Sequence, residues 1–148
     1  MPEEEAADRA REDEREGKSP STQAGEFVRE EMEHIREGEH GARSPEQAIA
    51  IGLSKARRAG VELPPPKRGK ERTKSQAKRD LAKGRAGGRK KTSRKRSRAT
   101  KGALKRESRR SASTKALSRR AKQAAAKRSA RSRSASAKKA ARTRKRRR

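Results

Sequence analysis

The sequence predicts a mainly α-helical protein with extensive disorder, in which a small two-helix hairpin precedes a long, low-complexity basic tail with transient helices. Only 26% of the 148 residues are hydrophobic, 45% are charged, and the aromatic residues are limited to one Phe. Ordering a residue costs about 1–2 kcal/mol of backbone entropy, which buried apolar surface offsets at about 25 cal/mol per Å². We therefore expect only a minor part of the chain to fold.

Charge divides the chain into two halves. Residues 1–63 carry 16 acids and 10 bases, whereas residues 64–148 carry 3 acids and 37 bases. The change falls at a polyproline run that cannot continue a helix. We expect four segments, which are an acidic disordered arm (1–18), a helical hairpin (19–63), a polyproline linker (64–66) and a basic Lys/Arg/Ala/Ser-rich nucleic-acid-binding tail (67–148).

The first helix of the hairpin is expected over residues 19–37. Ser19 followed by Pro20 is typical of a helix N-terminus, and Gly38 is a suitable stop. Apolar residues recur between these ends at helical spacing. They are Phe27, Val28, Met32 and Ile35.

The second helix has the clearest local signals in the chain. Ser44-Pro45-Glu46-Gln47 is a capping box with proline at the first helical position. Gly52 permits a close approach to another helix, and Gly60 fits the position after the C-cap, with Val61 folding back on Ala56. The apolar face contains Ala48, Ile49, Ile51, Leu53 and Ala56.

A hairpin of this size has a small core that would include Val61 and Leu63. Units below about 40–50 residues are rarely stable without a metal, disulfides or a partner. We therefore expect the hairpin to be marginally stable, to dimerise, or to dock on a protein partner. The interface residues are expected to be Phe27, Val28, Met32, Ile35, Ile49, Ile51 and Leu53.

The basic tail is expected to be disordered alone and partly helical when bound. Helix propensity is high over 75–83 and 113–128, but repulsion between like charges opposes helix formation in free solution. Gly84, Gly87 and Gly88 are expected to act as flexible breaks.

The tail points to a nucleic acid as the partner. Its cations can neutralise phosphates without reading sequence, and it contains no aromatic residue to stack on unpaired bases. We therefore expect duplex DNA, with RNA as an open alternative. The dense clusters are Arg89, Lys90, Lys91, Arg94, Lys95, Arg96, Arg98, Lys105, Arg106, Arg109, Arg110, Arg119, Arg120, Lys127, Arg128, Lys138, Lys139, Arg142, Arg144, Lys145, Arg146, Arg147 and Arg148.

No catalytic, cofactor or metal site is expected. The chain has no cysteine, and the spacing of its two histidines, His34 and His40, matches no standard ligand motif. We expect both histidines to be solvated or to lie in a turn. No apolar run is long enough to span a membrane, the N-terminus does not resemble a signal peptide, and apolar anchors for a membrane surface are missing.

Two segments resemble known families. Ser19-Pro20-Ser21-Thr22-Gln23-Ala24-Gly25-Glu26-Phe27-Val28-Arg29-Glu30-Glu31 and the stretch from His40 to Gly60 resemble a small uncharacterised bacterial family, over about residues 18–66. That family implies no activity. The Lys-, Arg- and Ala-rich tail is similar to bacterial histone H1-like proteins, which implies binding to the nucleoid.

These observations predict a non-enzymatic, nucleoid-associated protein of the cytoplasm that binds nucleic acid, most readily duplex DNA, independently of sequence. The alternative is an adaptor whose hairpin docks a protein partner while the tail tethers it to RNA, ribosome or DNA. The acidic arm would compete with nucleic acid for the tail if it folded back on it.

Overall fold

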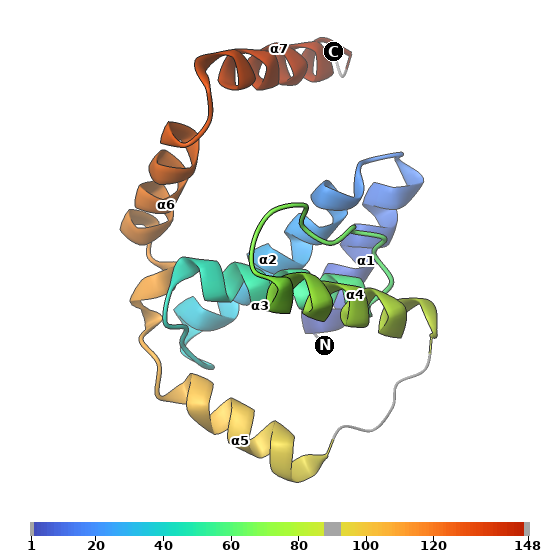
Figure 1. The fold of residues 1–148 in the computed structure, drawn as a ribbon. Helices are drawn as coiled ribbons and strands as arrows, with labels where there is room; N and C mark the ends of the chain where they lie inside the picture. Colours follow the sequence, from blue (N-terminus) through green and yellow to red (C-terminus); the bar gives the residue numbers. More distant parts are fainter. Residues whose placement is uncertain (1, 88–92, 147–148) are drawn as a thin grey trace. The chain divides into compact units, whose positions relative to one another are not determined.

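The computed structural model describes residues 2–87 and 93–146 (Figure 1). The chain divides into two units, Met1–Ser113 and Thr114–Arg148, which are called the first and second unit below. The helices of the first unit are α1 (Pro2–Arg15), α2 (Pro20–Glu37), α3 (Pro45–Arg58), α4 (Glu71–Arg85), α5 (Arg94–Lys105) and the short 3-10 helix η1 (Arg109–Ala112). The second unit contains α6 (Thr114–Ala126) and α7 (Ala130–Arg146).

The expected architecture of a two-helix hairpin with a disordered arm and tail is wrong. The structure is 76% helical, and helices occupy both the acidic N-terminus and the basic half of the chain. Two properties of the sequence account for this. Ala, Lys and Arg are strong helix formers, and alanine is small enough to pack helices together without large apolar side chains.

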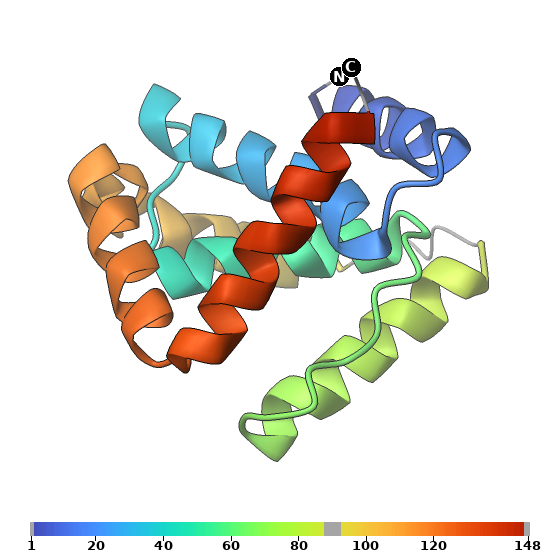
Figure 2. The same ribbon diagram turned by 90° about the horizontal axis from the view of Figure 1, so that it is seen from above.

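The helices of the first unit pack in chain order. α1 packs on α2, α2 on α3, and α3 on α4, an order that both Figure 1 and Figure 2 show. Ala6 and Ala10 of α1 lie one turn apart and are buried against α2. The core cluster consists of Ala6, Ala10, Ala24, Phe27, Ala56 and Val61. The acidic arm therefore contributes two of the core residues, although it was expected to be disordered.

The apolar residues expected at a hairpin interface lie within the first unit. Phe27, Met32 and Ile35 are buried, while Val28, Ile49, Ile51 and Leu53 are half-buried. Helix α1 covers one side of α2, and η1 contacts both α2 and α3. These neighbours were expected to be disordered, but they cover the two helices, and Ala6 and Ala10 of α1 join Phe27 in the apolar core.

The helix ends agree with the expected capping signals only in part, because the Ser19 side chain makes no cap hydrogen bond and Gln47 Oε1 accepts from the Arg43 N–H and not from that of Ser44. Ser44 Oγ accepts a hydrogen bond from the Gln47 backbone N–H at 3.3 Å. Gly38 and Gly60 both adopt left-handed backbone conformations, with φ of 89° and 106°. The Val61 N–H donates to the Ala56 carbonyl at 3.1 Å, which completes the expected fold-back at the end of α3.

Two glycines permit contacts that a side chain would prevent. A Cβ on Gly52 would lie 2.7 Å from Val28 Cα, so the expected close approach at this position is confirmed. Gly84 does not break the chain as expected, because it lies inside α4, where a Cβ would lie 2.0 Å from the Arg57 carbonyl oxygen. Gly88 lies outside the described residues.

The turn between α2 and α3 is held by the last turn of α5 and by the segment that follows this helix. The Gly41 N–H donates to the Leu104 carbonyl at 2.9 Å, and the Ala42 N–H donates to the Ser108 carbonyl at 3.1 Å. Arg36 Nε of α2 also donates to the Ala112 carbonyl at 3.0 Å. Residues 104–112 of the basic half are thereby joined to the two helices that were expected to form a hairpin.

The two helices of the second unit have no buried residue. Ser129 precedes α7, and its hydroxyl accepts a hydrogen bond from the Ser132 N–H at 3.2 Å. This is the N-terminal cap that favours a helix start. Within the described residues, no helix combines the length and the apolar character needed to span a membrane.

The Gly52→Ala variant is predicted to unfold at lower urea concentration than the wild type. The added methyl meets the backbone of Val28, and overpacking of this kind costs about 1–3 kcal/mol. Urea unfolding followed by circular dichroism measures the change.

Gly25→Ala is the matched control, because Gly25 lies in the middle of α2 with no atom within 4 Å of the added Cβ. This variant should be more stable by about 0.5–1 kcal/mol, as helix propensity dictates. Equal effects of both substitutions would contradict the tight contact at Gly52.

Candidate nucleic-acid interface

Helix α5 carries a row of cations along one face. Arg94, Arg98, Lys101 and Lys105 are separated by four, three and four residues, which places them within an arc of about 60°. All four side chains are exposed. They line a shallow groove of about 480 Å³ together with Ser97 and Gly102 and with no acid. These four cations are called the α5 stripe.

Helices α6 and α7 repeat this arrangement. The α6 stripe consists of Lys115, Arg119 and Lys122, and the α7 stripe of Arg131, Lys138, Arg142 and Lys145. The spacing again places each set within an arc of about 60°, and every member is exposed. The second unit has 16 bases and no acid, so neither stripe has an opposing carboxylate in its own unit.

The structure distributes the sequence-predicted phosphate contacts over several elements. Each described member is exposed except Arg120, which is half-buried. They lie on α5 and just after it (Arg94, Lys95, Arg96, Arg98, Lys105, Arg106), on η1 (Arg109, Arg110), on α6 (Arg119, Arg120), between α6 and α7 (Lys127, Arg128), and on α7 (Lys138, Lys139, Arg142, Arg144, Lys145, Arg146). Arg89, Lys90, Lys91, Arg147 and Arg148 lie outside the described residues.

Sequence reasoning missed four members of the stripes. Lys101, Lys115, Lys122 and Arg131 complete the rows but do not belong to dense cation clusters. Their signal was the repeated spacing of three, four or seven residues, which becomes meaningful once the segments are helices.

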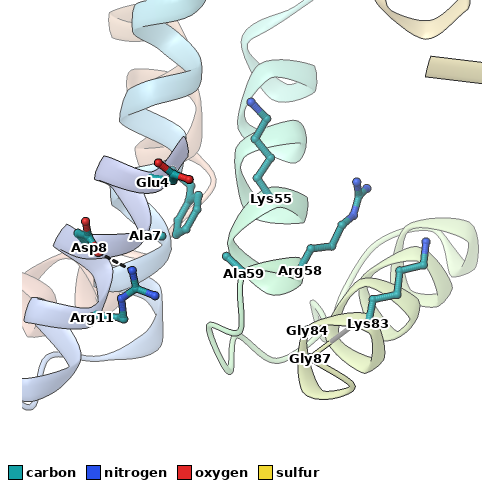
Figure 3. Close-up of a pocket in the computed structure, with 11 residues that line it drawn as sticks. Glu4, Ala7, Asp8, Arg11, Lys55, Arg58, Ala59, Lys83, Gly84 and Gly87 are labelled. Carbon is teal, nitrogen blue, oxygen red and sulfur yellow. Dashed lines mark hydrogen bonds and ion pairs between the residues drawn. The ribbon is translucent and has the colours of Figure 1, made fainter. Parts of the chain in front are cut away.

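A cavity of about 730 Å³ lies in the first unit between α1, α3 and α4 (Figure 3). Four cations line it, which are Arg11, Lys55, Arg58 and Lys83, together with the acids Glu4 and Asp8. Asp8 pairs with Arg11, and this hydrogen bond lowers the pKa of the Asp8 carboxyl. The charged walls differ from the apolar lining typical of small-molecule sites.

A buried carboxylate fastens α4 to α3 beside this cavity. Asp80 is fully buried and accepts hydrogen bonds from Arg58 Nε and Ser54 Oγ, both at 2.8 Å, and from Gln76 Nε2 at 3.1 Å. Burial alone would raise the pKa of Asp80, but these hydrogen bonds, that of Arg58 first, lower it below the usual value.

The two histidines come together with Glu31. One ring nitrogen of His34, one of His40 and a carboxylate oxygen of Glu31 all lie within 4.8 Å of one another. His40 lies in the turn, as expected, but the expectation of a solvated His34 is wrong, because this side chain lies on α2 and its residue is only 8% exposed. Glu31 is fully buried, with Lys55 Nζ 3.0 Å from its Oε2 atom.

The fold and its exposed cations define a small helical protein with cationic helix faces in its basic half. Residues 19–68 match a family of unknown function, DUF6496. The predicted resemblance of this segment to an uncharacterised family is therefore confirmed, whereas its bacterial origin and the histone H1-like character of the tail are not. No curated protein and no solved structure matches the chain.

Asp80→Asn is predicted to lower the free energy of unfolding at pH 7 by about 1–3 kcal/mol. The substitution removes a buried charge with several hydrogen bonds, while the half-exposed Arg58 keeps the loss below the value for a fully buried pair.

The free energy of unfolding, measured as the pH is lowered into the acid range, provides a second test of the role of Asp80. Because the folded pKa of Asp80 is lowered, its contribution is present above the unfolded value of about 3.9 and is lost as the pH falls below it. The wild type should lose this contribution to its free energy of unfolding in acid, whereas the Asp80→Asn variant, which lacks the carboxylate, should not. Glu14→Gln, at an exposed carboxyl of α1, should leave the unfolding midpoint at pH 7 unchanged.

Proposed function

We propose that the protein binds duplex nucleic acid independently of sequence, with the three cationic helix stripes neutralising phosphates. The observation that carries the proposal is the repeated alignment of exposed cations on α5, α6 and α7, without carboxylates among them. Phosphate contacts of this kind position a protein on a duplex but carry no sequence information.

The dimensions of the stripes suit a duplex. From Arg131 to Lys145 the α7 stripe extends about 21 Å along the helix axis at 1.5 Å per residue. A B-form duplex carries one charge per about 1.7 Å of axis, so a duplex of this length has about a dozen phosphates on its two strands, of which the stripe faces a part. An α-helix also fits the major groove, which is about 12 Å wide.

A duplex is favoured over a single strand because the chain offers no exposed aromatic platform. Single-strand binders stack bases on aromatic side chains, at about 1–3 kcal/mol per base. Phe27 is the chain's one aromatic residue, and it is 2% exposed in the core of the first unit. Binding to single strands would therefore depend on charge alone.

The adaptor alternative has no comparable support. Phe27, Met32 and Ile35, which were expected to dock a partner, are buried within the first unit. We therefore restrict the proposal to nucleic acid.

The first test is a titration of the full chain against duplex DNA, single-stranded DNA and duplex RNA at several salt concentrations. Binding to duplex DNA should be at least as tight as to the other two. The logarithm of the binding constant should fall steeply with the logarithm of salt concentration, by about 0.9 for each phosphate neutralised. A clear preference for single strands would contradict the proposal.

The second test compares two double variants of α7 that remove the same charge. Lys138→Gln/Arg142→Gln removes two members of the α7 stripe, whereas Arg133→Gln/Arg144→Gln removes two cations from roughly the opposite face. The stripe variant should reduce the salt slope by about 1.8 and weaken binding roughly tenfold.

The opposite-face variant should change the slope and the affinity much less. Circular dichroism of both variants provides the control for helix content. Equal losses in the two variants would show that net charge alone governs binding and that the stripes have no special role.

A further inference from the structure

A buried carboxylate lies beside two imidazoles at the junction of α2, α3 and the turn between them. Glu31 and His34 lie one turn apart on α2, and His40 lies in the turn. Glu31 is fully buried and His34 is 8% exposed. The basic stripes do not include these residues, and the proposed function does not use them.

The hydrogen bonding of His40 directs one nitrogen toward Glu31. His40 Nδ1 lies 3.1 Å from the Gly41 carbonyl oxygen, an acceptor that requires a proton on Nδ1. In the neutral ring, the lone pair of Nε2 then faces Glu31 Oε1 at 3.3 Å. Two acceptors repel at this distance unless a cation lies between them.

A proton on His40 Nε2 is the simplest such cation, but the geometry does not favour it. Within the described part of the chain, neither oxygen of Glu31 has a hydrogen-bond partner of acceptable geometry, despite the short distance to His40. Lys55 Nζ lies 3.0 Å from Glu31 Oε2, so the positive charge of Lys55 offsets part of the negative charge of the carboxylate. The other oxygen, Oε1, is directed toward the imidazole of His40.

The two ring nitrogens of His34, like those of His40, have different surroundings. Its Nδ1 atom lies 3.9 Å from Glu39 Oε2, whereas its Nε2 atom is buried without a hydrogen-bond partner among the described residues. Burying a polar nitrogen without a hydrogen bond is unfavourable. Metal-binding histidines commonly direct one nitrogen to a carboxylate or backbone carbonyl and the other to the ion.

We propose that Glu31, His34 and His40 bind a divalent transition-metal ion, and that Zn²⁺ is the ion whose preferences they fit. Two histidines and one glutamate are an established zinc ligand set, with bonds of about 2.0–2.2 Å. Ligand atoms on a tetrahedral ion then lie about 3.3 Å apart, which is the separation of His40 Nε2 and Glu31 Oε1.

The remaining distances require only small side-chain movements. One candidate ligand atom from each of the three residues lies within 4.8 Å of the other two, so such a set would have to close by no more than about 1.5 Å. Glu31 Oε1, His34 Nε2 and His40 Nε2 would be the ligands. Three protein ligands leave the fourth tetrahedral position for water.

A metal ion here would fasten the turn to α2. His40 directly precedes Gly41 and Ala42, whose N–H groups donate to the carbonyls of Leu104 at the end of α5 and of Ser108 after it. Bridging α2 and this turn would therefore stabilise the attachment of α5 and the segment after it to the rest of the first unit. The proposal is independent of nucleic-acid binding, so the failure of one leaves the other standing.

The test titrates the metal-free full chain with Zn²⁺ and with Co²⁺ as a spectroscopic probe. The wild type should bind one equivalent, give the visible absorption bands of tetrahedral Co²⁺, and unfold at a temperature that rises with Zn²⁺ concentration. Glu31→Gln and His40→Gln should each weaken Zn²⁺ binding at least 100-fold and abolish the Co²⁺ bands.

Glu37→Gln is the matched control, since Glu37 is an exposed carboxylate on the same helix. It should bind Zn²⁺ as the wild type does. Circular dichroism without metal tests whether each variant folds. If the fully buried Glu31 does not tolerate glutamine, His40→Gln, at a half-buried turn position, decides the question.

Three results would overturn the proposal. They are the absence of saturable Zn²⁺ binding by the wild type, binding that persists in a folded His40→Gln variant, and an equal loss of affinity in Glu37→Gln. The last two would place the ion on exposed carboxylates elsewhere.

Discussion

The close approach of α2 and α3 at Gly52 is the contact on which the rest of the first unit depends. With few large apolar side chains, helices gain enough contact only where their backbones come together, and Gly52 allows Val28 to reach the backbone of α3. This approach brings Lys55 to Glu31 across the same interface. Helices α1 and α4 then pack on the free sides of the pair, through alanines and through Gly84.

Local signals predicted the helices of residues 19–63 well because capping depends on residues close in sequence. The Ser44 cap and the glycines that end α2 and α3 are examples. The same signals could not predict that α1 packs on α2, because Ala6 and Ala10 become core residues only when another helix reaches them. Judging burial by large apolar residues alone thus underestimated how much of the chain folds.

The two candidate sites differ in how far the sequence reveals them. The α5 and α7 stripes follow from residue spacing once helices are assumed, and the error was to treat the segments as disordered. The cluster around Glu31 is different. The i, i+3 spacing places Glu31 and His34 on one face of α2, but His40 joins them only through the turn that Gly41 anchors to the end of α5. Such a long-range contact leaves no local pattern.

Folded stripes change the energetics of binding a polyanion. A disordered tail would have to order its backbone on the duplex, at about 1–2 kcal/mol per residue fixed. A helix that already aligns Lys138, Arg142 and Lys145 avoids most of that cost. Cations one turn apart repel each other by a few tenths of a kcal/mol per pair, and bound phosphates would remove this repulsion. Binding and helix stability are therefore thermodynamically linked, so that a duplex bound to the stripes stabilises the helices that present them.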